Sequence, residues 1–270
     1  QLLTEAEIEE RLKLHVLDIQ KVNDKVVCIA KPKDERRIKN NQRLAIHFEI
    51  QTTEKTDADL KTSGGSIQLA GLDGKLLFST SGGALILDHL KGEIKGATSG
   101  GSIDLDNSSG KIELATSGGS VLAKNSSGEI HLKSGGGSLE LVNLEGTING
   151  MTSGGSIKTE KIKGDLSIKT SGGSIRFKDF SGNLSGATSG GSIEGNVLSI
   201  KNELKLTTSA GSIRVDLPDT EGLDLELIGN KIESKLPFDS FSKKRSHTTQ
   251  INGGGKKVSL ITSSGNIFLD

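Results

Sequence analysis

The residues with the clearest potential for chemistry are three carboxylates, Asp88, Asp104 and Asp106. Asp104 and Asp106 alternate with Ile103 and Leu105, so on a β-strand both carboxylates would point to one face. Paired carboxylates cleave glycosidic bonds, one as the acid and the other as base or nucleophile. These residues therefore raise a polysaccharide-active enzyme as one alternative for this chain.

The charges around these carboxylates argue against a catalytic site. Residues spaced 18 apart alternate in sign, as in Lys75, Glu93, Lys111 and Glu129. Alternating charge pairs on neighbouring strands are typical of a solvated sheet face. Because no carboxylate cluster is distinct from this background, we predict that the chain is not an enzyme and has no catalytic residues.

Metal and cofactor sites are not indicated either. Pairs of metal-ligating histidines are commonly a few residues apart, and no such pair occurs among the five histidines, His15, His47, His89, His131 and His247. The recurrent Gly-Gly-Ser-Ile segment lacks the Lys-Ser/Thr and the following helix of a phosphate loop. We therefore expect no bound metal and no cofactor.

A polar and basic stretch near the C-terminus is the remaining candidate for binding. We predict that residues 239–250 form an exposed loop, and function concentrates on loops that a rigid scaffold carries. The simpler alternative is a solvent-exposed loop that has no binding role. The candidate binding residues in this segment are Lys243, Lys244, Arg245 and His247.

Composition narrows the class of partner. The 34 Lys and Arg residues balance 34 Asp and Glu residues, so net charge does not favour nucleic acid or an anionic membrane as partner. Aromatic residues make up 3% of the chain and none is Trp or Tyr, so stacking platforms for bases or sugars are not expected.

No segment approaches the ~20 apolar residues of a transmembrane helix. The single cysteine, Cys28, lies in an apolar run and is predicted to be a small buried hydrophobe.

An internal repeat defines the elements that must position these residues. Thr-Ser-Gly-Gly or a close variant recurs every 18 residues, followed by one step of 20 and a last distant copy. If the Thr is position 1, positions 6, 8, 15 and 17 are mostly apolar and position 13 is Gly in seven successive copies. Apolar residues two apart indicate strands, and the glycines indicate tight corners. The copies begin at Thr62, Thr80, Thr98, Thr116, Ser134, Thr152, Thr170, Thr188, Thr208 and Thr262.

The repeat predicts an all-β fold, a single-stranded parallel β-helix (β-solenoid) with two short strands in each 18-residue coil. The general rule for parallel crossovers favours a right-handed coil. Parity places the position-1 Thr on the inward face, where its hydroxyl would close the edge of the core and hydrogen-bond along the stack. Asn202 replaces a position-13 Gly, and we expect it to adopt the left-handed conformation that Asn tolerates.

We divide the chain into three parts of one continuous domain. Residues 1–61 cap the solenoid or lead into it, residues 62–215 form the regular coils, and residues 216–270 form degenerate C-terminal coils that include the loop 239–250. The first part has a capping box in which Thr4 and Glu7 begin a helix. Its predicted elements are this helix near 5–12, strands around 14–20 and 25–30 with a turn at Asn23-Asp24, and an alternating strand over 44–50.

Repeated Thr-Ser-Gly-Gly-Ser-Ile coils after a helix–strand segment resemble the bacterial adhesin family of Gly/Ser-rich β-solenoids, a family of unknown function. The stretch from Ile251 to Gly255 and the stretch from Leu260 to Ile267 are similar to the C-terminal signature of that family. The resemblance covers residues 5–270. It implies an exported protein, located at the cell surface or in the periplasm or envelope, and it supplies no catalytic residues.

Three functions follow as hypotheses. The first is a non-catalytic surface or envelope scaffold, an adhesin that binds cells, matrix or glycans through its walls or through loop 239–250. Its partner would be a protein or glycan surface ligand. The second is a self-assembling structural protein of the envelope, and the third is the polysaccharide-active enzyme.

Overall fold

The computed structural model describes residues 3–34, 36, 38–39, 42, 44–235 and 245–270. The chain forms two compact units, Gln1–Thr52 and Thr53–Asp270. Each unit is described on its own. The first solenoid strand, β3, starts at Ala58, so the solenoid unit begins before the predicted boundary at residue 62.

The first unit contains the predicted helix and hairpin. Helix α1 (Glu5–Leu12) begins at a capping box, in which the Thr4 hydroxyl accepts from the Glu7 backbone N–H and the Glu7 carboxylate accepts from the Thr4 N–H. Strands β1 (His15–Val22) and β2 (Lys25–Pro32) pair antiparallel. Their turn includes Asn23 at φ 56°, and Asn is the residue that best tolerates this conformation after Gly.

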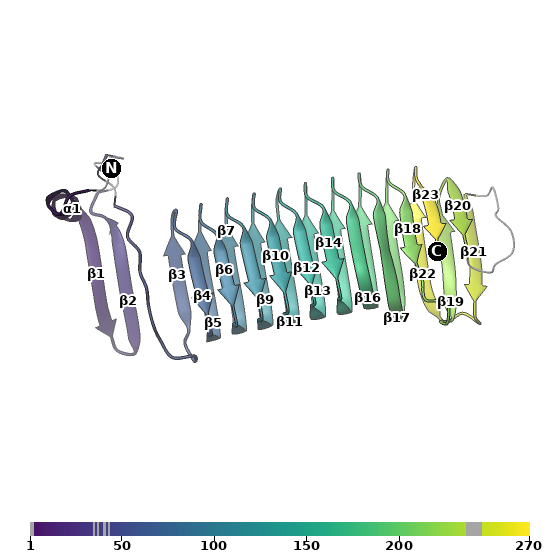
Figure 1. Cartoon of the computed structure of the whole chain (residues 1–270), viewed down its shortest axis with the longest axis horizontal. Helices are drawn as coiled ribbons and strands as arrows, with labels where there is room; N and C mark the ends of the chain where they lie inside the picture. The colour runs from purple at the N-terminus through teal and green to yellow at the C-terminus, as the bar shows by residue number, and fades with distance from the viewer. Residues whose placement is uncertain (1–2, 35, 37, 40–41, 43, 236–244) are drawn as a thin grey trace. The chain divides into compact units, whose positions relative to one another are not determined.

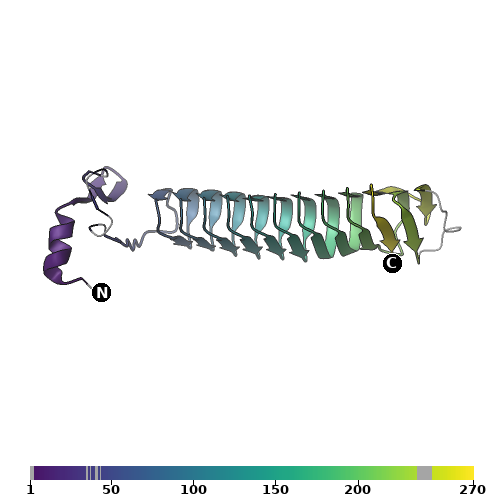
Figure 2. The ribbon, with the colours of Figure 1, turned by 90° about the horizontal axis from the view of Figure 1, so that it is seen from above.

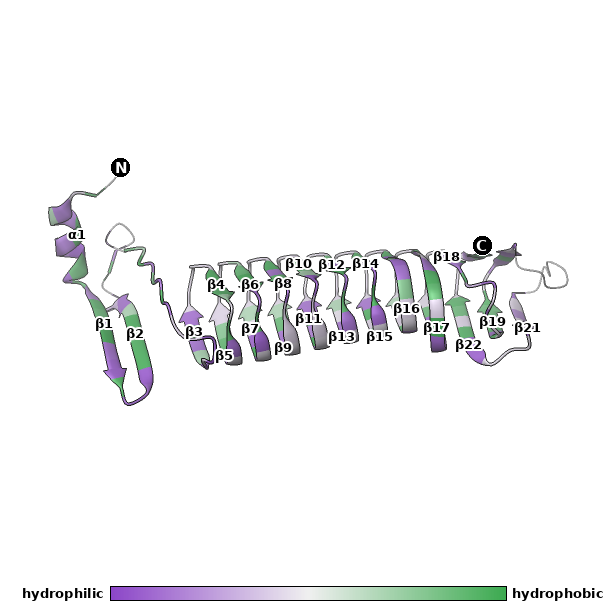
Figure 3. Ribbon diagram, turned by 60° about the horizontal axis from the view of Figure 1, so that its bottom comes forward, coloured by the Kyte–Doolittle hydropathy of each residue, from purple (hydrophilic) through white to green (hydrophobic). Residues whose placement is uncertain are grey.

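One face of this hairpin is apolar and open. Leu17, Ile19 and Val26 are 51%, 63% and 64% exposed, and apolar residues cover much of both strands (Figure 3). Cys28 lies opposite Ile19 and is half-buried, whereas the sequence predicted a buried residue. The reason is that the two-stranded sheet has no second layer among the described residues of its unit.

The alternating segment 44–50 is not a strand, which corrects that prediction. Leu44, Ile46 and Phe48 are half-buried and Ala45 and His47 are exposed, so burial does alternate along the chain. A strand also requires a hydrogen-bonded neighbour, and this segment has none among the described residues. The alternating sequence therefore predicted the alternating burial of this segment. The strand that it also predicted does not form, because the segment has no hydrogen-bonded neighbour among the described residues.

The second unit is the predicted parallel β-solenoid of 18-residue coils. In each regular coil a long strand pairs with the long strand 18 residues on, and a short strand does the same, as in β7 with β9 and β6 with β8. The two sets form two walls (Figures 1 and 2). The long-strand wall contains β3 (Ala58–Thr62), β5 (Asp73–Thr80), β7 (Lys91–Thr98), β9 (Ser109–Thr116), β11 (Ser127–Ser134), β13 (Glu145–Thr152) and β15 (Lys163–Thr170).

The short-strand wall lies across the core from it. It contains β4 (Ile67–Ala70), β6 (Leu85–Asp88), β8 (Ile103–Asp106), β10 (Val121–Lys124), β12 (Leu139–Val142), β14 (Ile157–Glu160) and β18 (Ile213–Asp216). Strands β16 (Ile175–Thr188) and β17 (Ile193–Thr208) run through both walls, and their register shifts absorb the 20-residue coil. Alternate residues of both walls point inward, so Ile, Leu and Val from successive coils form one continuous core.

The position-1 hydroxyls form a ladder along one edge of this core, as predicted from parity. Thr116 is 4% exposed. Its hydroxyl donates to the Gly101 carbonyl oxygen of the preceding coil at 2.8 Å and accepts from the Gly119 N–H of its own coil at 3.1 Å. Thr80, Thr98, Ser134, Thr152, Thr170, Thr188 and Thr208 make the same pair of bonds. Each hydroxyl therefore fastens the Gly corners of two coils.

Thr116→Val and Thr159→Val are expected to change stability in opposite directions. The first leaves the Gly101 carbonyl and the Gly119 N–H without the hydroxyl, which costs about 2 kcal/mol. The Thr159 hydroxyl is buried and has no hydrogen-bond partner among the described residues, so its replacement by a methyl group should raise stability by about 1 kcal/mol. The thermal unfolding midpoints of both variants check this prediction. Equal changes in the two midpoints would contradict the stabilising role of the position-1 hydroxyls.

The corner after the short strand differs from the prediction in two respects. Six of the seven glycines at position 13 adopt positive φ as expected, for example 121° at Gly110, and Gly74 does not. Asn202 does not adopt positive φ, which corrects that prediction. Its N–H donates to the Asn183 side-chain oxygen, because the longer coil continues as strand through this point. The second left-handed residue of the regular corner is instead at position 10, as in Asn107, Asn125 and Asn143.

The last coil in sequence is not the last coil in the stack (Figure 1). Strand β22 (Lys256–Thr262) lies between β17 and β19 (Leu223–Ile228), and β23 (Asn266–Leu269) lies between β18 and β20 (Lys231–Ser234). The Thr262 hydroxyl donates to the Gly211 carbonyl oxygen at 2.8 Å, so the last motif copy continues the ladder directly from Thr208. The predicted degenerate coils that precede this copy in sequence therefore do not precede it in the stack.

Strand β21 (Ser246–Ile251) pairs antiparallel with β19. This corrects the predicted loop 239–250, because its second half is a strand. The segment has β-forming residues in Thr248, Thr249 and Ile251, and β19 supplies the neighbour that they need. The first part of the predicted loop, 239–244, lies outside the described residues.

Candidate functional site

The three candidate catalytic carboxylates lie on the short-strand wall, and two of them accept hydrogen bonds from other side chains. Asp88 lies opposite Asp106 on adjacent strands, and Asp104 lies opposite Ile86. The Asp88 and Asp106 carboxylates accept hydrogen bonds from the side chains of Asn107 and Asn125, at 3.2 and 2.9 Å. These bonds connect the corners of successive coils, so both carboxylates have a structural role.

Asp88 is also held in its ionised form. His89 Nδ1 lies 2.8 Å from its carboxylate. Hydrogen bonds from His89, and secondarily from Asn107, lower the pKa of Asp88. A general acid would need a raised pKa, so this carboxyl is a poor candidate for that role.

Two of the four basic candidates, Arg245 and His247, lie among the residues that the structure describes. Arg245 is exposed, and its carbonyl oxygen accepts from the Gly229 N–H. His247 is half-buried in β21, opposite Leu227. Lys243 and Lys244 lie outside the described residues. In the part of the chain that the structure describes, no group of His, Cys, Asp and Glu could hold a metal ion. No helix there is long and apolar enough to cross a membrane.

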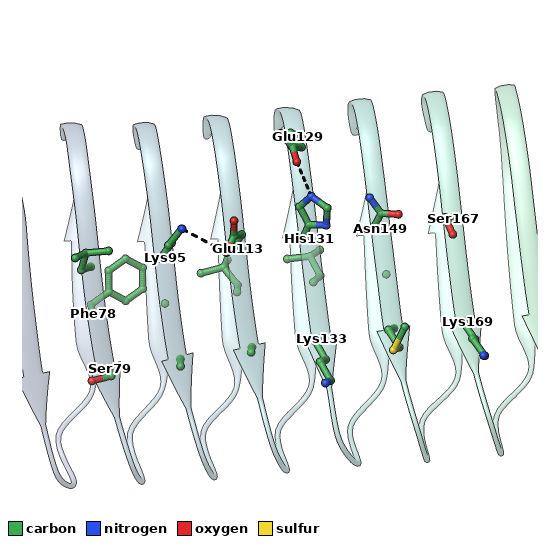
Figure 4. Close-up of a pocket in the computed structure, with 18 of the residues that line it drawn as sticks. Phe78, Ser79, Lys95, Glu113, Glu129, His131, Lys133, Asn149, Ser167 and Lys169 are labelled. Atoms are coloured by element: carbon green, nitrogen blue, oxygen red, sulfur yellow. Dashed lines mark hydrogen bonds and ion pairs between the residues drawn. The ribbon is translucent and has the colours of Figure 1, made fainter.

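One concave feature of the solenoid is a shallow groove of about 1020 Å³ on the outer face of the long-strand wall (Figure 4). It crosses the strands from β3 to β15, so it runs along the stack. Its lining comes mainly from the outward positions 16 and 18 of each coil. Ser79, Ala97 and Ala115 occupy position 18 on three successive strands. These small side chains leave the wall low between the longer residues around them.

The N-terminal half of the groove is a network of ion pairs. Lys61 lies 3.4 Å from Asp59, and Lys95 lies 3.2 Å from Glu93 and 3.7 Å from Glu113. The hydrogen bond from Lys95, and then the charge of Lys75, lower the pKa of Glu93. Exposed pairs of this kind add little stability, but they neutralise this part of the wall.

His131 and Glu129 continue the network at its C-terminal limit. Their side chains lie 2.9 Å apart (Figure 4). The hydrogen bond from His131, with a further contribution from the charge of Lys111, lowers the pKa of Glu129. The three carboxylates that line the groove, Asp59, Glu113 and Glu129, therefore each have a cationic or imidazole partner.

Sequence reasoning did not single out this groove. The repeat predicted which residues face outward, and the mixed charges were interpreted as a solvated face. The signal that was available is the run of small residues at position 18, Ser79, Ala97 and Ala115, between Lys61 and Lys133. Whether such a run makes a hollow depends on side chains of neighbouring coils, which only the structure places.

A model of the Toastrack DUF4097 family matches residues 35–270. Comparisons with curated proteins and with solved structures gave no match. The family match agrees with the repeat architecture and does not bear on adhesion or cell-surface location, which stay predictions. Because the match covers most of the chain and the whole solenoid, the chain belongs to the Toastrack DUF4097 family.

Proposed function

We propose that this β-solenoid domain is a non-catalytic binding scaffold, which presents the groove of its long-strand wall to an extended protein or glycan ligand outside the cytoplasm. The observation that carries the proposal is the groove itself, about 1020 Å³ in volume and open along several coils. A polymer can follow such a groove with one contact per strand, because strands repeat about every 4.8 Å. The location is inferred from the resemblance to adhesin-type solenoids.

The rigidity of the long-strand wall supports a binding role. Each coil is fixed to the next by main-chain pairing and by the buried position-1 hydroxyl. Outward side chains are thus held on a rigid surface, which lowers the conformational cost of binding. The candidate catalytic carboxylates lie on the other wall, where Asp88 and Asp106 connect the corners of successive coils. This supports the choice of a binding function over polysaccharide cleavage.

The test is a binding panel with a filled groove. The full chain, the double variant Ala97→Gln/Ala115→Gln and the control Ile86→Gln are passed over immobilised matrix proteins and over neutral and acidic glycans. Ile86 is 42% exposed on the short-strand wall, so the control adds glutamine to the opposite face. We expect at least one ligand to bind both the wild type and the control, and we expect the double variant not to bind that ligand. Equal binding by all three proteins would refute the groove as the site.

A further inference from the structure

Two lysines in the groove differ from its other charged residues. Lys133 on β11 and Lys169 on β15 are exposed at position 18. They line the groove, and neither has an ion pair or side-chain hydrogen bond among the described residues. Figure 4 shows both on the open face of the wall, in contrast to Lys95 and His131, which contact carboxylates.

The surroundings of these lysines contain hydrogen-bonding groups and no free carboxylate. Asn149 and Ser167 lie next to them at position 16 and line the groove. Glu129 is bonded to His131. Asp165, the outward carboxylate two residues before Ser167, accepts from the Asn183 side chain at 2.7 Å. A ligand at this end of the groove would therefore meet two positive charges together with neutral amide and hydroxyl groups.

The spacing of the lysines indicates the type of anion. They are two strands apart, with Met151 at position 18 between them. Two strand spacings amount to about 10 Å, which is similar to the length of one disaccharide in an extended glycan. A polymer with one acidic group per disaccharide could thus place successive anions at both lysines, while its hydroxyls contact Asn149 and Ser167.

Two other ligand classes fit this surface less well. Neutral sugars usually need an aromatic platform, and the one aromatic residue that lines the groove, Phe78, is only 4% exposed. Extended peptides usually add to the edge of a sheet through main-chain hydrogen bonds. The groove crosses the face of the wall, where main-chain groups already pair with neighbouring strands.

We propose that the C-terminal half of the groove binds an anionic glycan, with Lys133 and Lys169 as the residues that recognise its acidic groups. The inference rests on the proposed function, because it names the ligand class of the same groove. It also assigns a binding role to two residues that the sequence did not single out.

The experiment measures binding of three probes to the full chain at low and at physiological salt. The probes are a hyaluronan hexasaccharide, which has one carboxylate per disaccharide, an uncharged chitin hexasaccharide, and a hexamer of glutamate. The variants are Lys133→Ala/Lys169→Ala and the matched control Lys124→Ala/Lys163→Ala. The control removes the same charge from residues that do not line the groove. Hydrogen exchange of each variant confirms that the solenoid is intact.

We expect the hyaluronan probe to bind in preference to chitin and to weaken with salt, since charge-assisted contacts between exposed groups are screened. Loss of both lysines should raise its Kd by about tenfold, and the control should raise it less than twofold. Stronger binding of the glutamate hexamer would overturn the glycan assignment. Equal binding of hyaluronan and chitin, with no effect of the lysine pair, would overturn the inference and leave the proposed function standing. No binding of any probe would overturn the inference as well, and the filled-groove panel would then decide the proposed function separately.

Discussion

Gly110→Val is expected to destabilise the solenoid by about 3 kcal/mol or more, the sum of strain at a special backbone conformation and of overpacking. Gly110 has φ 121°, a region that a β-branched residue does not adopt without strain. A Cβ at this position would also lie well inside 3.0 Å of the Gly92 carbonyl oxygen. That oxygen belongs to the adjacent strand, so it cannot move without disturbing the main-chain pairing.

Lys111→Val is the control for this prediction. Lys111 is the next residue of the same strand, it is exposed, and its side chain lies 3.9 Å from Glu113. It tolerates a β-branched residue because its backbone is ordinary strand. Thermal unfolding with hydrogen exchange should place the damage of Gly110→Val in β7, β9 and β11, since each coil contacts only its neighbours. If both variants unfold alike, the account of this corner is wrong.

The second large effect is expected at position 4, where Gly119→Ala should cost about 1 to 3 kcal/mol. A Cβ there would lie well inside 3.0 Å of the carbonyl oxygen of Gly101, the equivalent residue of the preceding coil. The close approach exists because the Thr116 hydroxyl holds both glycines, by donating to one and accepting from the other. The methyl group would thus push apart the coils that the ladder joins.

The adjacent glycine provides a matched control. A Cβ at Gly118 would be 3.6 Å from the nearest atom, the Ser99 carbonyl oxygen, which is an ordinary contact. The chain itself has Ala210 and Ser264 at equivalent positions. Gly118→Ala should therefore leave the unfolding midpoint unchanged or slightly higher. A drop equal to that of Gly119→Ala would contradict the stacking of the two corners.

Much of the solenoid could be predicted because each coil repeats the same constraints. Strand parity placed Thr116 and its equivalents inward. The successive glycines at position 13 identified a corner, and six of these seven glycines adopt positive φ. The end of the stack was less predictable. The spacing of 54 residues between Thr208 and Thr262 equals three periods, and it suggested three coils in series. The chain instead inserts β22 and β23 beside β17 and β18, because an equivalent motif stacks best on a regular neighbour.

Function was harder to predict, for a physical reason. The carboxylates of Asp88 and Asp106 lie opposite each other on adjacent strands, but each accepts a hydrogen bond from an Asn side chain of the next coil. The groove has no motif of its own. It arises where small side chains of three coils line up beside longer ones, so it is a property of the stack and of no single segment.

The central claim, that the groove faces ligands outside the cytoplasm, can be tested by labelling one engineered cysteine on living cells. The chain has one cysteine, so Cys28→Ser/Ser167→Cys places the single thiol in the groove and Cys28→Ser/Lys124→Cys places it on the opposite wall. A membrane-impermeant maleimide is added to intact or lysed cells, with or without hyaluronan. The account predicts that both thiols are labelled on intact cells and that hyaluronan slows labelling only in the groove. Labelling that appears only after lysis would contradict it.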